Sequence, residues 1–96
     1  MDAAERLGEN ILRVRQARKL SQESLAERAE VHRTQISLIE SGRREPRIYT
    51  LVRLAGALEV DASTLLEGIA WNPAEPGRTG EFVVTDPPEL PRFGRP

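Results

Sequence analysis

Residues 21–42, SQESLAERAEVHRTQISLIESG, contain two short helical patterns with almost no chain between them. Ser21 is a good helix N-cap, and Leu25, Ala26 and Ala29 share one face of a helix of about eight residues. The apolar pattern is then interrupted and resumes in a new phase. The stretch therefore predicts that one short helix ends and another begins at once, and this junction decides the fold.

The second helical pattern has a polar start and an apolar continuation. It opens on four polar residues, His32, Arg33, Thr34 and Gln35. Ile36 and Ile39 turn toward the core, and Gly42 is a natural left-handed stop. A helix braced by a neighbour can project its first turn into a DNA major groove, which is wide enough to admit it. Polar side chains in that turn need no partner inside the protein.

Three further helices are expected outside this pair. The first covers residues 3–18, with an apolar face formed by Leu7, Ile11, Val14 and Ala17. Another runs from about Ile48 to Leu58, after a charged loop that Pro46 closes. The last is short, begins after Asp61 as N-cap, and continues through Leu65, Leu66 and Glu67 to Gly68. Helices with such short connections predict a compact all-α bundle.

The composition changes after Gly68, where six of the seven prolines occur. Ile69–Trp71 and Phe82–Val84 are apolar, and the intervening segment is rich in Gly and Pro, so we expect a two-stranded hairpin. An isolated hairpin is marginal in water, so these strands must pack on the bundle or on another chain. The chain is thus expected to divide into a helical domain, a hairpin and an extended or disordered Pro-rich tail, at residues 1–67, 68–85 and 86–96.

Composition excludes several classes of protein. The chain of 96 residues has no cysteine, a single histidine and no phosphate-cradling glycine loop, so we expect no enzyme, no metal site and no cofactor. No signal peptide or membrane span is apparent, which favours a cytoplasmic protein. The net charge is −1, and residues 1–67 hold eleven basic and eleven acidic side chains. Any binding of nucleic acid must therefore depend on where the charges lie.

The segment LSQESLAERAEVHRTQISLIESGRREP, followed by TLVRLAGALEVDASTLL, resembles the Cro/C1-type (XRE) helix-turn-helix family of bacterial and phage transcription regulators. The resemblance covers roughly residues 7–67 and keeps the order of the family's motif elements. It implies a five-helix, lambda repressor-like DNA-binding domain, here with a C-terminal hairpin or extended appendage. It also implies a homodimer that binds double-stranded DNA in the bacterial cytoplasm, associated with the nucleoid when bound.

The resemblance also implies roles for individual residues. His32, Arg33, Thr34 and Ser37 match positions that contact bases. Phosphate contacts are expected from five residues: Gln22, Gln35, Arg43, Arg44 and Arg47. Arg15 and Glu40 match a buried or half-buried ion pair that ties the first helix to the end of the recognition helix.

The residues themselves leave alternatives open. The forked donors of Arg33 fit the O6/N7 edge of guanine, and the docking geometry favours this base contact; the alternatives are a phosphate clamp or a solvated charge. His32 could simply cap its helix, Thr34 could touch a thymine methyl or a phosphate, and Gln35 could be only half exposed. The basic run at residues 43–47 could be an ordinary solvated loop.

Two residues depart from the family pattern. Lys19 and Glu30 stand where the family usually has glycine, and a residue other than glycine at positive φ costs on the order of 1 kcal/mol. Either the turn is reshaped at these positions or the core absorbs the strain.

Two hypotheses of function follow. The first is a dimeric repressor or autoregulator that reads an inverted-repeat operator, with candidate dimer contacts at Ile69, Trp71, Phe82 and Val84. The second is an antitoxin-like or other interaction module whose C-terminal appendage grips a partner protein. For Trp71 and Phe82 the simpler alternative is that they belong to the small core of the chain itself.

Overall fold

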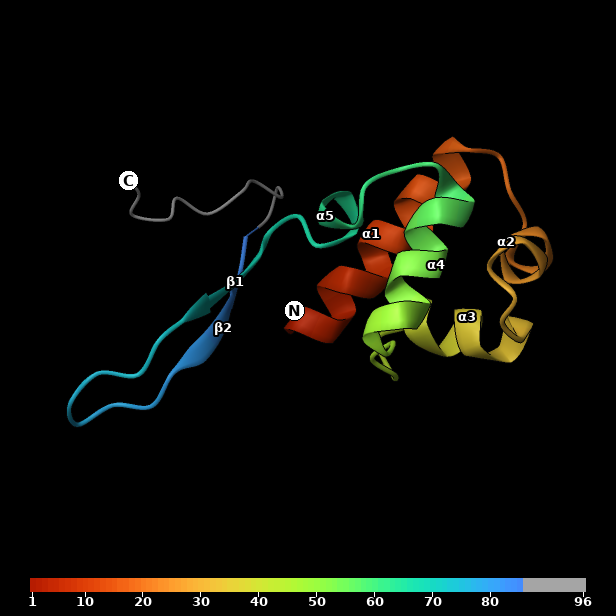
Figure 1. Ribbon diagram of the computed structural model, residues 1–96. Helices are drawn as coiled ribbons and strands as arrows, with labels where there is room; N and C mark the ends of the chain where they lie inside the picture. Colours follow the sequence, from red (N-terminus) through yellow and green to blue (C-terminus); the bar gives the residue numbers. More distant parts are fainter. Residues whose placement is uncertain (86–96) are drawn as a thin grey trace.

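Five helices followed by a β-hairpin make up the chain in the computed structural model, which describes residues 1–85 (Figure 1). The elements are α1 (Ala3–Ala17), α2 (Gln22–Ala29), α3 (Arg33–Glu40), α4 (Ile48–Leu58), α5 (Ala62–Leu65), β1 (Ile69–Asn72) and β2 (Glu81–Val84). This architecture confirms the expected all-α bundle with its C-terminal hairpin. The tail predicted for residues 86–96 lies outside the described residues.

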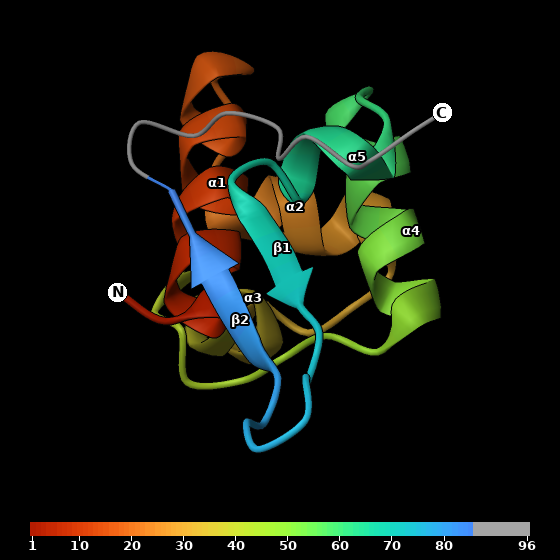
Figure 2. The ribbon, with the colours of Figure 1, turned by 90° about the vertical axis from the view of Figure 1, so that its left-hand side faces the viewer.

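The helices enclose one hydrophobic core. Helix α1 packs against α3 and α5, and α2 packs against α3 and α4, so α3 is held from two sides (Figure 2). The largest apolar side chains with almost no exposure are Ile11, Leu25, Ile36, Ile39, Leu54, Leu58 and Leu65. Within residues 1–85, none of the helices is both long enough and apolar enough to cross a membrane.

The first two helices begin with side-chain caps. Asp2 accepts a hydrogen bond of 2.8 Å from the backbone N–H of Glu5, and the Glu5 carboxylate accepts one of 2.8 Å from the N–H of Asp2. This reciprocal capping box satisfies two donors that a helix start leaves free. Ser21 caps α2 as expected, because its hydroxyl accepts a hydrogen bond of 2.9 Å from the N–H of Ser24. The cap fixes where α2 begins, close to the end of α1.

Three helices end on a residue other than glycine in the left-handed conformation. Lys19 and Glu30 both have φ of 59°, so the turns keep the geometry that glycine would favour. Glu59, after α4, has φ of 60°, which no sequence pattern indicated. The residues that follow the three, Leu20, Val31 and Val60, each pack against the core. Burial of these apolar side chains offsets the backbone strain.

The ends of α1 and α5 correct two expectations. The sequence pattern puts Ala17 on the apolar face of the first helix, but Ala17 is exposed, because the chain turns at Lys19 and Leu20 packs on the core instead. The last helix ends at Leu65 and does not reach Glu67. The side-chain amide of Asn10 donates hydrogen bonds of 3.0 Å and 2.8 Å to the Leu65 and Glu67 carbonyls, which satisfies two carbonyls where the chain leaves the helix.

Two polar side chains of α1 are fully buried, although no sequence pattern indicated it. Arg6 is 0% exposed, and its Nη1 lies 2.6 Å from the Glu9 carboxylate. Asn10 is also 0% exposed and is the residue that joins α1 to the end of α5. Buried polar groups are normally hydrogen-bonded, and through its two hydrogen bonds Asn10 links α1 to the chain at the end of α5.

The hairpin extends away from the helical bundle (Figure 1). Its strands pair antiparallel, with Ile69 opposite Val84 and Trp71 opposite Phe82. Ile69 packs on the core, whereas Trp71 and Phe82 are 54% and 61% exposed. The two rings meet edge to face, with their centroids 5.0 Å apart. The alternative that these aromatics belong to the core of the chain is therefore wrong, because both rings are more than half exposed, although Phe82 also lines an apolar hollow beside Leu7 and Leu51 of the bundle.

Candidate nucleic-acid interface

The junction between α2 and α3 is as tight as the sequence predicted. Only residues 30–32 separate the two helices, and Glu30 makes the left-handed turn. The Val31 N–H donates a hydrogen bond of 2.9 Å to the Ala26 carbonyl, which closes the end of α2. Buried side chains from both helices, Leu25 and Ile36 among them, lock the pair together. Helix α3 is thus braced along its apolar face and open along the other.

The first turn of α3 faces solvent. His32 occupies the N-cap position but makes no capping hydrogen bond through its side chain, so its imidazole is not a cap. Arg33, Thr34 and Ser37 are exposed, and Gln35 is half-buried. The polar side chains at this end are therefore available to a molecule outside the chain.

An open hollow of about 240 Å³ lies between the start of α2 and the exposed side of α3. It is lined by Gln22, Arg33, Thr34 and Ser37. The hollow brings together three residues expected to contact bases and one expected to contact a phosphate.

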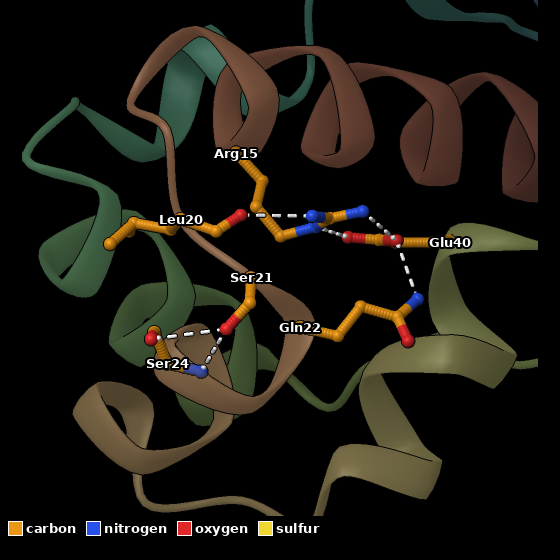
Figure 3. Close-up of polar contacts among 6 residues, drawn as sticks. All are labelled: Arg15, Leu20, Ser21, Gln22, Ser24 and Glu40. Carbon is orange, nitrogen blue, oxygen red and sulfur yellow. Dashed lines mark hydrogen bonds and ion pairs between the residues drawn. The ribbon is translucent and has the colours of Figure 1, made fainter.

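Arg15 and Glu40 form the ion pair that the resemblance implied (Figure 3). Nε and Nη2 of Arg15 donate to the two carboxylate oxygens of Glu40 over 2.7 Å and 3.1 Å. Nη1 of Arg15 also donates to the Leu20 carbonyl over 2.9 Å. The side chains of the pair are only 13% and 6% exposed. This bidentate pair fixes the end of α3 against α1.

Gln22 belongs to the same network. Its Nε2 donates a hydrogen bond of 2.9 Å to Oε1 of Glu40, and Figure 3 shows its side chain reaching from α2 toward that carboxylate. An amide has two N–H donors, so one donor and the amide oxygen remain for another partner. The network therefore orients Gln22 at the edge of the interface, a constraint that the sequence did not reveal.

The loop between α3 and α4 carries the basic run. Arg43, Arg44 and Arg47 are all exposed, and within residues 1–85 none of them forms an ion pair. The Arg43 N–H donates a hydrogen bond of 2.9 Å to the Leu38 carbonyl, which ties the start of the loop to α3. Three cations thus stand on a loop anchored to the candidate recognition helix.

Two neighbours of α3 were missed by the sequence analysis. Glu23, in the first turn of α2, places a carboxylate oxygen 3.8 Å from Nη1 of Arg33. Gly8 of α1 lies so close to the end of α3 that a β-carbon there would stand 2.6 Å from the Glu40 carbonyl oxygen. No sequence pattern indicated either contact, because each joins residues from different helices. Among residues 1–85 there is no group of three or more side chains suited to holding a metal ion.

A short helix with an exposed polar first turn, braced by a second helix and flanked by a basic loop, defines a helix-turn-helix DNA-binding domain. A family model described as helix-turn-helix matches residues 11–65, and the chain belongs to this family, in its XRE branch. It is accordingly a DNA-binding transcription regulator.

Proteins with similar sequences are named as regulators as well. The chain is 42% identical over 66 residues to the control protein C.SmaI of Serratia marcescens, covering 69% of this chain and 79% of that protein. It is 38% identical over 60 residues to an immunity repressor of Bacillus phage phi105, covering 62% of this chain and 42% of the repressor. The similarity is thus concentrated in the helical domain.

Solved structures share the fold. The restriction-modification controller protein C.AhdI from Aeromonas hydrophila superimposes with a TM-score of 0.64 at 29% identity, covering 65% of this chain and 94% of that one. The clp gene regulator ClgR from Corynebacterium glutamicum gives a TM-score of 0.67 at 26% identity, covering 69% and 85%.

Proposed function

We propose that this protein is a dimeric, sequence-specific repressor or autoregulator that reads an inverted-repeat operator. The observation that carries the proposal is the exposed first turn of α3, where His32, Arg33 and Thr34 face solvent and His32 makes no capping hydrogen bond. Relatives named as a control protein and an immunity repressor support the regulatory role. The site of action is the bacterial cytoplasm, with the protein on the nucleoid when bound, and no catalytic step is part of the proposal.

The proposed contacts divide into two groups. His32, Arg33, Thr34 and Ser37 read base edges in the major groove. Gln22, Gln35, Arg43, Arg44 and Arg47 hold phosphates on either side and set the position of α3. The exposure of the three loop arginines supports this division, because among residues 1–85 they form no ion pair that would keep them from the backbone of DNA.

Two copies are needed for the proposed mode of reading. One small module contacts only a half-site, whereas a twofold dimer reads two half-sites about 34–36 Å apart. The hairpin supports dimerisation, because it carries an exposed pair of aromatic rings, and its strands lie at the end of the molecule far from α2 (Figures 1 and 2). Contacts through Ile69, Trp71, Phe82 and Val84 would therefore leave the DNA-binding end accessible.

Selection of bound duplexes from a random DNA pool tests the proposal. We expect enrichment of one sequence with two inverted half-sites separated by about one helical turn. Recovery of sequences with no shared element would contradict sequence-specific binding. Enrichment of a single, unrepeated half-site would contradict the dimeric mode while leaving sequence-specific binding in place.

Two arginine variants distinguish the proposed base contacts from the proposed phosphate contacts. Arg33→Ala should weaken binding to the selected site by about 1–3 kcal/mol and relax the preference at one base position. Arg44→Ala should weaken binding to all sequences alike and reduce the salt dependence, because it removes a phosphate contact. Binding titrations at several salt concentrations measure both effects. An equal loss on selected and random DNA for Arg33→Ala would refute its role in base reading.

A second candidate function is supported by the hairpin. Exposed strands and aromatic side chains are common docking elements, so the arm could grip a different protein in the manner of an antitoxin. Copurification of a stoichiometric second protein, with no dimer of this chain alone, would favour this function. A twofold dimer that buries Trp71 and Phe82 would favour the repressor.

A further inference from the structure

Glu23 lies beside the exposed end of α3 although it belongs to α2. Its Oε1 is 3.8 Å from Nη1 of Arg33, and the two side chains are 77% and 63% exposed. This distance is too long for a hydrogen bond but lies within the range of an ion pair. Its sequence neighbour Gln22 lines the same hollow as Arg33. A carboxylate therefore stands at the edge of the surface that meets DNA, where the phosphates would repel it.

The position of the Glu23 carboxylate disfavours the binding of any anion to the Arg33 guanidinium, because the two negative charges would lie close together. A phosphate oxygen that accepts a hydrogen bond from Nη1 lies about 2.9 Å from that nitrogen. With Glu23 at 3.8 Å from the same nitrogen, the two oxygens are at most about 7 Å apart. This separation is below the Debye length of about 8 Å in physiological salt, so the repulsion is only partly screened.

A guanine edge is affected much less. Its O6 and N7 atoms carry only partial negative charge, and the base as a whole is neutral. The same carboxylate therefore disfavours a phosphate contact of Arg33 more than a guanine contact. Arg33 itself lines the hollow beside α3, so the carboxylate stands next to the guanidinium on the surface proposed to receive the bases.

We propose that Glu23 is a specificity-determining residue that acts through Arg33, biasing this arginine toward base edges and away from phosphates. The inference rests on the proposed function of Arg33 in base reading. The charges elsewhere fit this role: Arg43, Arg44 and Arg47 stand on a separate loop and supply attraction to phosphates, so Arg33 is not needed for it. Glu23 lowers the affinity for random DNA and thereby raises the ratio of specific to non-specific binding.

The test is a competition assay with two labelled duplexes of equal length, one with the site selected by the wild-type protein and one of random sequence. Glu23→Gln keeps the size and polarity of the side chain and removes its charge. We expect the ratio of specific to random binding to fall roughly two- to fivefold, mainly because random DNA is bound more tightly. Glu23→Asp, which retains the charge, should keep most of the ratio.

Glu27→Gln is the matched control, because Glu27 is an exposed glutamate of the same helix and forms no ion pair with Arg33. Its loss of charge should strengthen binding to both duplexes equally and leave the ratio unchanged. The dependence on Arg33 is tested in an Arg33→Ala background, where Glu23→Gln should no longer change the ratio. A role of Glu23 limited to stabilising the start of α2 would not disappear in that background.

The outcomes separate this inference from the proposed function. If the wild-type protein prefers the selected duplex and Glu23→Gln has the same ratio of specific to random binding, the role of Glu23 is overturned. Sequence-specific binding is then left intact. A ratio that falls equally with and without Arg33 overturns that role in the same way. A wild-type protein that binds both duplexes alike overturns both.

Discussion

Arg15 and Glu40 show how single residues hold the recognition helix in place. The guanidinium makes two hydrogen bonds to the carboxylate and another to the Leu20 carbonyl, and Gln22 donates a third hydrogen bond to the same carboxylate. Both charges are mostly removed from water, so each depends on the other for compensation. Together with Gln22 the pair connects three helices, because Arg15 is on α1, Glu40 on α3 and Gln22 on α2.

Removing one partner should be more harmful than removing both. Arg15→Met leaves the Glu40 charge poorly compensated and should lower the free energy of unfolding by about 3 kcal/mol. Adding Glu40→Met should recover more than half of that loss, because no isolated charge remains. Recovery stays incomplete, since the Leu20 carbonyl has lost its donor in both variants. Urea unfolding measures the difference, and a double variant less stable than either single variant would contradict this account.

At the scale of the helices, α1 and α3 approach each other closely at Gly8. Gly8 faces the Glu40 carbonyl at the end of α3, where there is no room for a β-carbon. Because α3 is also packed against α2, its position is set by two neighbours at once. The absence of a side chain at Gly8 lets α1 approach closely enough for Arg15, two turns further along, to reach Glu40.

Two glycine-to-alanine variants test this close approach. Gly8→Ala should push α1 away from α3 and lower the free energy of unfolding by about 2 kcal/mol, as overpacking does elsewhere. Gly56→Ala is the matched control, because Gly56 lies in helix α4, where an added β-carbon would have no atom within 4 Å. This variant should raise stability by up to about 1 kcal/mol, since alanine favours helix. Equal changes in the denaturation midpoints of the two variants would show that the α1–α3 contact tolerates a side chain.

At the scale of the whole molecule, the long axis of the chain separates two kinds of surface. Helix α2 lies at one end and the hairpin at the other (Figures 1 and 2). Beside the hairpin, an apolar hollow of about 190 Å³ is lined in part by Leu66, Ile69 and Phe82. Exposed apolar side chains at the hairpin end are costly in water and are typical of an interface. The shape therefore favours association at one end and DNA binding at the other.

Removing the two exposed rings should weaken the dimer without unfolding the bundle. The double variant Trp71→Ser, Phe82→Ser should raise the dimer dissociation constant at least about tenfold, because aromatic anchors dominate interface energy. Its thermal unfolding should change little, since both rings lie outside the core. Tyr49→Ser is the control, because Tyr49 is an exposed aromatic residue on α4, 79% accessible and outside the hairpin. Sedimentation equilibrium measures the dissociation constant, and an unchanged value would exclude the hairpin as the dimer element.

Much of the architecture could be predicted from local patterns. Three local features indicated the helix pair: the Ser21 cap, the apolar repeat of α2 and the glycine at position 42. Each depends only on residues within one or two helical turns of it. The left-handed turns at Lys19 and Glu30 could be anticipated only through the resemblance to a family. The helix α5 is two residues shorter than expected, and the hydrogen bonds from the distant Asn10 to the carbonyls at its end are tertiary contacts that no local pattern indicates.

The sequence by itself determined that two short helices follow one another and that the second begins with exposed polar side chains. It did so because apolar spacing and capping chemistry are local properties of the chain. The tertiary structure alone decided that Glu23 stands beside Arg33, that Gly8 meets the end of α3 and that Arg6 is buried. Each of these depends on how separate helices pack, and packing follows from the three-dimensional fit of many side chains at once.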